Sequence, residues 1–303
     1  MNFNLTILGT GSAIPSFGRF SSSQVLQTHN KSFMIDCADG TQFQLRKYEV
    51  KTNRMGHVFI SHLHGDHCFG LISVISTLGM LHHTNDMYIH AHPDLKKTLQ
   101  PMLDYFCKDL TFKVFFEDFD PLKNEVIYED RSIKVSTIPL VHSMPTCGFL
   151  FKEKEGLPHI DGELVKFYKI GVKEIQNIKN GADFIDENGR VVPNSRLITP
   201  PTPPKSYAYC SDTAYTERII PIIEGVDTLF HEATFAEAER HRCKATLHST
   251  ASDAAHIAKM ANVKQLIIGH YSARYADLNP LLDEAQAIFP NTKLSTDGSK
   301  FSW

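Results

Sequence analysis

The segment His62-Leu63-His64-Gly65-Asp66-His67 decides how this chain is interpreted. It places four metal-ligating side chains in six residues, directly after the apolar run 57–60. We expect that run to be a buried strand, and alternate residues of a strand, such as His62 and His64, point to the same face. Gly65 then permits a sharp turn that presents the last two ligands. Three imidazoles and a carboxylate suit two adjacent divalent ions of the zinc type better than one.

The composition is that of an ordinary globular protein. The chain has 303 residues, a net charge of -3, 42% hydrophobic and 21% charged residues, so it is not coated in charge for nucleic-acid binding. It begins with a strand-like run rather than a signal peptide, and no apolar stretch approaches the roughly 20 residues of a membrane span. The cysteines form no C-x-x-C pair, and we expect them to be reduced in a cytoplasmic protein: Cys37, Cys68, Cys107, Cys147, Cys210 and Cys243.

Strand-like and helix-like segments alternate along most of the sequence. This alternation predicts a layered α/β architecture in which helices cover sheets. The expected strands are 3–9, 23–27, 32–36, 57–60, 87–90, 135–140, 207–210, 228–230 and 265–268, and the expected helices are 40–48, 70–79, 94–105 and 251–260.

The segment from about Lys152 to Lys205 differs from the rest. It is rich in charges of both signs and in glycine, and it ends in Pro200-Pro201-Thr202-Pro203-Pro204. A structureless loop of this length is unusual inside a compact domain. The segment is therefore an inserted lobe or arm, or a linker between two domains. We favour an arm inserted in a single domain of residues 1–303, because the polar clusters on both sides look like parts of one site.

Three further ligand-type residues follow expected strands. They are His142, Asp212 and His270, and strand ends are where α/β proteins assemble sites from distant residues. Adding them to the motif completes two ligand sets with Asp212 as the bridge and an open position for water, as in a catalytic zinc site. The first set is His62, His64, His142 and Asp212, and the second is Asp66, His67, Asp212 and His270.

Two ions of this kind can activate a shared water and stabilise charge at a phosphoryl group. The leaving alkoxide then needs a proton, for which His248 is our candidate general acid. It lies just before the expected helix 251–260, which has Ser249 or Thr250 as its N-cap. The alternative is a histidine that merely belongs to the capping region. His231 is a candidate for orienting a ligand.

A second histidine cluster consists of His82, His83, His90 and His92. We reject these as primary ligands, because no acidic partner follows at short range. We interpret them as surface or packing residues.

With these residues in place, the chain resembles the metallo-β-lactamase superfamily, whose motif H-x-H-x-D-H is met at 62–67. More narrowly, it is similar to the ribonuclease Z family of tRNA 3′-processing endonucleases. The matching segments occur in the family's order along nearly the whole chain. They are Leu8-Gly9-Thr10-Gly11-Ser12, Asp36-Cys37-Ala38-Asp39-Gly40-Thr41-Gln42, Ser211-Asp212-Thr213, His231-Glu232-Ala233-Thr234, His248-Ser249-Thr250 and Gly269-His270-Tyr271-Ser272-Ala273-Arg274-Tyr275.

The resemblance implies a four-layer αβ/βα sandwich, a homodimer, and two Zn²⁺ per subunit, with Mn²⁺ or another divalent ion as an alternative. It implies cleavage of the 3′ trailer from precursor tRNA, leaving a 3′-hydroxyl on the tRNA and a 5′-phosphate on the trailer. In the family, the residue matching His248 assists the leaving group, and the one matching Asp66 is a ligand that is also discussed as a proton acceptor. Glu232 joins His231 as a candidate for orienting a ligand.

The family also carries an arm that binds tRNA, and segment 152–205 occupies its place. Here the chain departs from many bacterial relatives, because residues 171–181 lack a Gly-Pro-rich core. Two other hypotheses stay open on the residues alone. One is a dinuclear hydrolase of a small phosphodiester or thioester, which has no need of the arm. The other is a non-catalytic RNA-binding protein with a structural metal centre.

Overall fold

The computed structural model describes residues 3–14, 16 and 18–303. The chain forms two compact units. The larger contains the residues up to Lys152 together with Lys205–Trp303, and the smaller is the intervening segment Glu153–Pro204. The chain thus leaves the larger unit once and returns to it.

The first sheet of the larger unit has seven strands in the order β18-β1-β2-β3-β4-β5-β6. Its first half is antiparallel, and β2 and β3, which match the expected strands 23–27 and 32–36, form a hairpin. From β3 to β6 the strands are parallel. The bounds are β1 Asn4–Gly9, β2 Ser23–Thr28, β3 Lys31–Cys37, β4 Met55–Phe59, β5 Met87–Ala91, β6 Val114–Asp118 and β18 Lys300–Ser302.

The second sheet also has seven strands, in the order β17-β16-β15-β14-β9-β8-β7. Strands β14 to β17 are parallel, and β9 pairs with β14 in the antiparallel sense. The bounds are β7 Val126–Glu129, β8 Ile133–Pro139, β9 Cys147–Glu153, β14 Ser206–Cys210, β15 Thr228–Glu232, β16 Gln265–Gly269 and β17 Thr292–Leu294.

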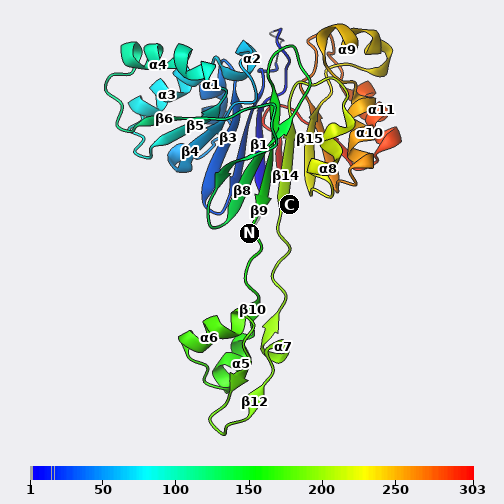
Figure 1. Ribbon diagram of the computed structural model, residues 1–303. Coiled ribbons are helices and arrows are strands. Elements are labelled where there is room, and N and C mark those ends of the chain that lie inside the picture. The colour runs from blue at the N-terminus through cyan, green and yellow to red at the C-terminus, as the bar shows by residue number, and fades with distance from the viewer. Residues whose placement is uncertain (1–2, 15, 17) are drawn as a thin grey trace. The chain divides into compact units, whose positions relative to one another are not determined.

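Helices lie on the outer sides of the two sheets (Figure 1). On the side of the first sheet these are α1 Thr41–Lys47, α2 Gly65–Cys68, α3 Leu71–Met80 and α4 Asp94–Phe106. On the side of the second they are α8 Ile220–Ile223, α9 Arg240–Thr246, α10 Ala251–Met260 and α11 Asn279–Ile288, with 3-10 turns at Glu217–Ile219 and Glu237–Glu239. A further 3-10 turn, Thr52–Arg54, directly precedes β4 of the first sheet. Within the described residues, none of the helices has the length and apolar character that crossing a bilayer requires.

Three hydrophobic clusters separate these layers. The cluster between the sheets joins Phe33 and Phe59 of the first sheet to Phe149 and Tyr207 of the second. Another lies between the first sheet and α3 and α4, and a third between the second sheet and α10 and α11. The apolar side chains buried there are the main stabilising contribution to the fold. The predicted four-layer αβ/βα sandwich of the metallo-β-lactamase type is therefore confirmed.

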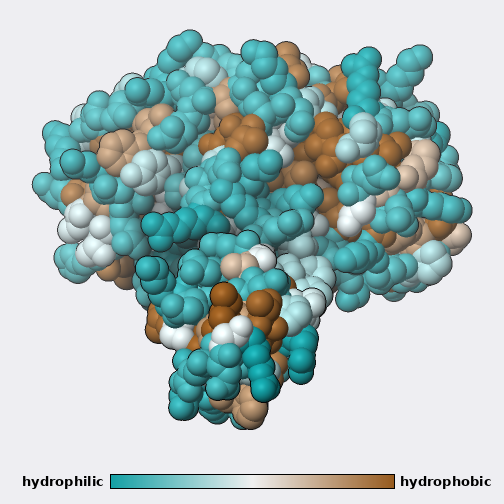
Figure 2. Space-filling view, turned by 60° about the horizontal axis from the view of Figure 1, so that its bottom comes forward, coloured by the Kyte–Doolittle hydropathy of each residue, from teal (hydrophilic) through white to brown (hydrophobic). Residues whose placement is uncertain are grey.

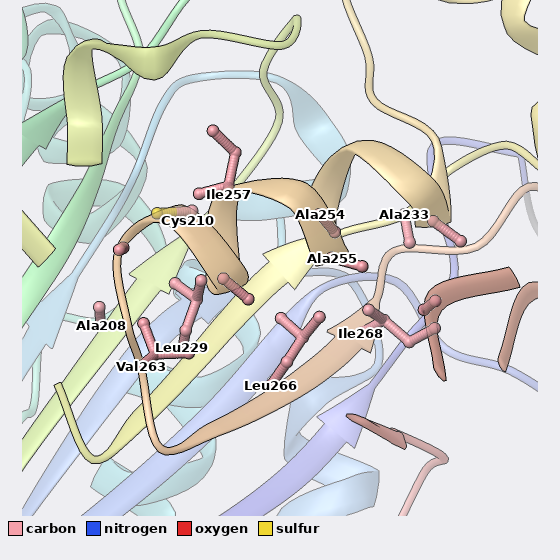
Figure 3. Packing of buried hydrophobic residues seen from close by; sticks show 14 of the residues in the cluster. Ala208, Cys210, Leu229, Ala233, Ala254, Ala255, Ile257, Val263, Leu266 and Ile268 are labelled. Atoms are coloured by element: carbon pink, nitrogen blue, oxygen red, sulfur yellow. The ribbon is translucent and has the colours of Figure 1, made fainter. Parts of the chain in front are cut away.

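Helix α10 shows how the local sequence sets the outer layer. The Thr250 hydroxyl accepts the Asp253 N–H at 3.1 Å, and the Asp253 carboxylate accepts the Thr250 N–H at 3.1 Å. This capping box makes Thr250, rather than Ser249, the N-cap. Small residues on its inner face, such as Ala254, let the helix lie close to β15 and β16 (Figure 3). The capped start of the helix also fixes the position of the preceding residues, among them His248.

The parallel strands β14, β15 and β16 place three polar segments at one edge of the second sheet. They pair side by side, so their carboxyl ends lie together. Asp212 follows β14, Glu232 is the last residue of β15, and His270 follows β16. Ligands in α/β proteins bind at such strand ends.

The smaller unit has short elements and its own core. The core is built around Ile170, Ile178, Val192 and Leu197, and the unit exposes other large apolar side chains, including Phe167. Figure 2 shows hydrophobic residues on the face of this unit that is turned to the viewer. Its elements are β10 His159–Ile160, α5 Gly162–Phe167, α6 Val172–Lys179, β11 Phe184–Ile185, β12 Val191–Val192, α7 Asn194–Leu197 and β13 Ile198–Thr199.

Candidate metal centre

The histidine motif lies beyond the end of its strand. Strand β4 stops at Phe59, His62 and His64 lie in the following loop, and the last two ligands lie on the short helix α2. The expectation that His62 and His64 belong to a strand was therefore wrong. The reason is local: the Ser61 N–H donates to the carboxylate of Asp36 at 2.8 Å instead of to a neighbouring strand.

The first predicted ligand set converges in the structure. The Nδ1 atom of His64 lies 3.0 Å from His62 Nε2 and 3.3 Å from His142 Nε2. The Oδ2 atom of Asp212 lies 3.7 Å from His62 Nε2 and 3.8 Å from His142 Nε2. Four ligand atoms from three loops, the one after β4 and those after β8 and β14, thus face one point.

The second predicted set converges beside the first. The Oδ1 atom of Asp212 lies 3.3 Å from His67 Nε2 and 3.2 Å from His270 Nε2. The Oδ2 atom of Asp66 lies 3.5 Å and 3.7 Å from the same two nitrogens. Each carboxylate oxygen of Asp212 therefore faces a different set, which is the arrangement of a bridging ligand.

Most of these imidazoles are fixed through the nitrogen that points away from the centre. His67 Nδ1 donates to Asp36 at 2.7 Å, and His142 Nδ1 donates to the Leu247 carbonyl at 3.0 Å. His270 Nδ1 lies 2.9 Å from the Thr234 hydroxyl. Hydrogen bonds of this kind select the tautomer whose Nε2 lone pair is free to bind a metal.

The donor set fits two divalent cations. The Nε2 atoms of His67 and His270 are buried and lack a hydrogen-bond partner among the described residues. Buried polar atoms are normally satisfied, so these two nitrogens indicate a missing partner. Ligands at roughly 2.0–2.1 Å around a tetrahedral ion lie about 3.3 Å from one another. The nitrogen separations at His64 are close to that value.

The charges of the centre reinforce this conclusion. Burial raises the pKa of Asp212, but the nearby rings of His270 and His67 outweigh it and hold that pKa well below its usual value. Burial also raises the pKa of Asp66, but the neighbouring rings of His270 and His67 outweigh it and lower that pKa. Burial lowers the pKa of His62 and His142. The centre therefore offers ionised carboxylates, and His62 and His142 as neutral imidazoles, which are the forms that bind metal.

Asp36 is an important residue that spacing arguments missed. Its buried carboxylate accepts hydrogen bonds from the Ser61 N–H and hydroxyl, from His67 Nδ1, and from the Tyr209 hydroxyl at 2.6 Å. Its φ of 53° lies in the left-handed region. The sequence signal was its place at the end of an expected strand, in the Asp36–Gln42 segment quoted above.

Strained backbone recurs at the centre. Leu247, whose carbonyl holds His142, has φ 54°, and His270 has φ 61°. Such conformations cost on the order of 1–3 kcal/mol each in residues other than glycine. The surrounding hydrogen bonds stabilise them, as expected where a site requires a fixed geometry.

His248 lies beside the two ligand sets. Its ring centre is 5.1 Å from that of His142 and 5.3 Å from that of His270. Its Nδ1 donates to Glu232 Oε1 at 2.8 Å. Burial lowers the pKa of His248, but the Glu232 carboxylate outweighs it and raises that pKa to about 9. This raised pKa favours the protonated ring, whose Nε2–H is not engaged by Glu232.

Glu232, rather than His231, makes the side-chain contacts here. Its Oε2 accepts from the Thr234 hydroxyl at 2.6 Å, and that hydroxyl also contacts His270. The His231 ring instead donates to the Glu232 carbonyl at 2.7 Å. In the described part of the chain, no recorded contact joins the His231 ring to a ligand.

The other histidine cluster stays outside the centre. His90 stacks on Phe59 at 4.4 Å and contacts His57 at 3.1 Å, and His83 packs against Phe112. Neither belongs to a ligand group in the described residues. His83 and His90 thus pack against neighbouring rings, while the exclusion of all four histidines as ligands stays a prediction.

The two-sheet sandwich with paired histidine–aspartate groups defines a metallo-β-lactamase fold protein. Its structure is similar to the metallo-beta-lactamase fold protein YhfI from Bacillus subtilis (TM-score 0.69, 18% identity, 100% of both chains covered). It is also similar to human tRNase Z, short form (TM-score 0.69, 23% identity, 98% of both chains covered). At these identities the likeness concerns the fold.

The particular family follows from sequence relatives. The chain is 55% identical over 300 residues to a ribonuclease Z of Phocaeicola vulgatus, covering 99% of this chain and 97% of the relative. It is 51% identical to a ribonuclease Z of Parabacteroides distasonis, covering 99% of both. The chain belongs to the ribonuclease Z family.

A family model described as "Anti-Pycsar protein Apyc1" also matches, over residues 3–159. That span contains the histidine motif and His142 but neither Asp212 nor His270. The ribonuclease Z relatives match through both halves of the centre.

Proposed function

We propose that this protein is a zinc-dependent endoribonuclease that removes the 3′ trailer from precursor tRNA. The products would be a tRNA with a 3′-hydroxyl and a trailer with a 5′-phosphate. The observation that carries the proposal is the 55% identity, over nearly the full length, to a protein named ribonuclease Z. The converged ligand groups supply chemistry that suits this reaction.

Two ions would be held by the two sets, with Asp212 shared between them. His62, His64 and His142 complete the first set, and Asp66, His67 and His270 the second. When bound, the ions would lower the pKa of a water molecule and neutralise charge on the phosphoryl oxygens. The donor set suits Zn²⁺, and Mn²⁺ or another divalent ion is an alternative.

His248 would supply the proton for the leaving group. Water oxygen attacks phosphorus, the bond from phosphorus to the tRNA 3′-oxygen breaks, and that oxygen must gain a proton. Glu232 anchors Nδ1 of the imidazolium, which leaves the Nε2 proton available for the 3′-oxygen. Asp66, beside the same centre, is the candidate acceptor for the proton released by the attacking water.

The smaller unit, within about Lys152–Lys205, would be a substrate-binding arm. Its own core allows it to hold a shape while exposing Phe167. Lys166 and Lys169, close to Phe167 in the sequence, form exposed ion pairs with Glu163 and Glu187 and would exchange these partners for phosphates. We also propose a homodimer and a cytoplasmic location, on the family relation; light scattering and fractionation test these two points.

The test uses purified, zinc-loaded protein and a labelled precursor tRNA with a 3′ trailer. We expect one main cut, with the ends stated above. Bis(p-nitrophenyl) phosphate serves as a second substrate that reports the metal centre alone. Turnover of this small diester with an intact precursor would favour the small-phosphodiester hypothesis. Tight RNA binding without either activity would favour the non-catalytic one.

A further inference from the structure

An exposed aromatic ring lies directly beside the metal-ligand motif. Phe69 follows α2 and is 69% exposed. Its ring lies against Gly65, where a Cβ atom would collide with it. One side of the Phe69 ring thus contacts Gly65, the residue between His64 and Asp66, while much of the ring faces solvent.

A second exposed ring lies against the residue that precedes α1. Phe20, 38% exposed, lies against Gly40, where a Cβ atom would again collide with the ring. The segment 37–40 connects the two positions, because the Gly70 N–H donates to the Cys37 carbonyl at 2.8 Å. The backbone of Phe20 is fixed by its N–H bond to Asp297 at 2.7 Å. Each ring is therefore held in place on one side by its contact with a glycine, Gly65 for Phe69 and Gly40 for Phe20.

The surroundings of these rings suit a nucleotide. Arg19, next to Phe20, donates to the Tyr275 carbonyl through Nη2, whereas its buried Nη1 has no hydrogen-bond partner among the described residues. That atom is shielded from solvent, so Arg19 holds the Phe20 segment against the Tyr275 backbone rather than offering a free donor. Exposed aromatic rings stack on unpaired bases, and proteins recognise single-stranded RNA in this way.

We propose that Phe69, with Phe20 beside it, forms a stacking platform for an unpaired base next to the scissile phosphate. The inference rests on the proposed function and names part of its substrate site. The base would lie on the exposed face of Phe69 while the phosphate enters the centre. Phe69 is a positioning residue for the substrate and takes no part in proton transfer.

A double-mutant cycle tests the platform. The protein variants are Phe69→Ala, Phe69→Tyr and the control Phe106→Ala. Phe106 is similarly exposed, at 65%, but ends α4, which leads to the start of β6 at the opposite end of the parallel strands from the motif. The precursors are a normal one and two with an abasic nucleotide, one on each side of the cleavage position. KM and kcat are measured for every pair, with metal content and molecular mass.

We expect Phe69→Ala to raise KM for the normal precursor about tenfold, the size of one lost base stack. With the matching abasic precursor the penalty should disappear, because the base that stacks is already missing. Phe69→Tyr should restore the wild-type KM, and Phe106→Ala should leave it unchanged.

If Phe69→Ala raised KM equally for the normal and both abasic precursors, the platform would be overturned. The same holds if the rise in KM came with loss of metal or with dissociation of a dimer. These failures differ from failure of the proposed function, in which the wild type hydrolyses bis(p-nitrophenyl) phosphate but leaves every precursor intact.

Discussion

The metal centre and the smaller unit differ in how many contacts hold their side chains in place. In the centre, buried side chains from both sheets each make several contacts, and Asp36 alone joins three other residues. In the smaller unit, short elements surround a small core and most charges are exposed. The fixed geometry of the metal centre thus depends on many side chains that hold one another in place through hydrogen bonds. In the smaller unit, the proposed substrate-binding arm, residues 171–181 lack a Gly-Pro-rich core.

The largest effect on precursor cleavage is expected from removal of Asp212, the ligand that the two metal sets share. Asp212→Ala removes the carboxylate that faces His62 and His142 in one set and His67 and His270 in the other, and it leaves both metal sets incomplete. We expect precursor cleavage to fall more than about a thousandfold, since several kcal/mol of charge stabilisation are lost. Metal analysis should find less than the wild-type content. Full metal content with near-normal cleavage would show that Asp212 is not a bridge.

His248→Ala should separate proton transfer from metal binding. Loss of a general acid costs about 10²–10⁴-fold in kcat, while the metal content should stay at the wild-type value. Glu232→Gln is the milder partner variant, with a loss of about 10–100-fold, because it weakens the anchor of the ring without removing the ring. If His248→Ala lost its metal, the residue would be structural instead.

Deleting residues 155–202 and joining the ends with a short glycine–serine linker tests the other region. A second binding site on the same chain raises the affinity for a large substrate. We expect kcat/KM for precursor tRNA to fall about a hundredfold, whereas hydrolysis of bis(p-nitrophenyl) phosphate should continue. Unchanged precursor cleavage would remove the substrate-binding role of the smaller unit.

The smallest effect concerns stability at low pH. Burial, with Lys31 nearby, lowers the pKa of His57 to about 4, and burial with His57 nearby lowers that of His90 to about 3. The unfolded chain takes up protons below about pH 6.5 and the folded chain does not, so stability falls as pH drops from there. The slope is at most about 1.4 kcal/mol per pH unit per histidine.

His90→Phe should therefore flatten the pH dependence of unfolding. Urea midpoints between pH 7.5 and 5.5 provide the measurement, with the wild type at each pH as the control. Since the ligand carboxylates and imidazoles are the same in both proteins, their contribution cancels in the difference. Parallel curves for the two proteins would contradict the buried neutral pair.

The sequence predicted much of the fold and most of the centre. His142, Asp212 and His270 were found because each follows an apolar strand, and adjacent parallel strands end at one edge. The contacts of Asp36 were not found, since a hydrogen bond to Tyr209, 173 residues away, depends on how two sheets pack.

Edge strands were also missed, because short strands such as β7 and β17 lack a clear hydrophobic period. Helix α2 was taken for a bend, because a four-residue helix leaves little signal. The elements of the smaller unit escaped prediction for similar reasons, since its short strands and few buried residues give no strong pattern.

The most direct test of the account is end mapping of precursor tRNA after incubation with the zinc-loaded wild-type protein, beside its Asp212→Ala and His248→Ala variants. We expect one cut by the wild type, with a 3′-hydroxyl on the tRNA and a 5′-phosphate on the trailer. We expect almost no cut by either variant, with metal retained only in His248→Ala. An intact precursor with the wild type, or a 2′,3′-cyclic phosphate at the cut, would contradict it.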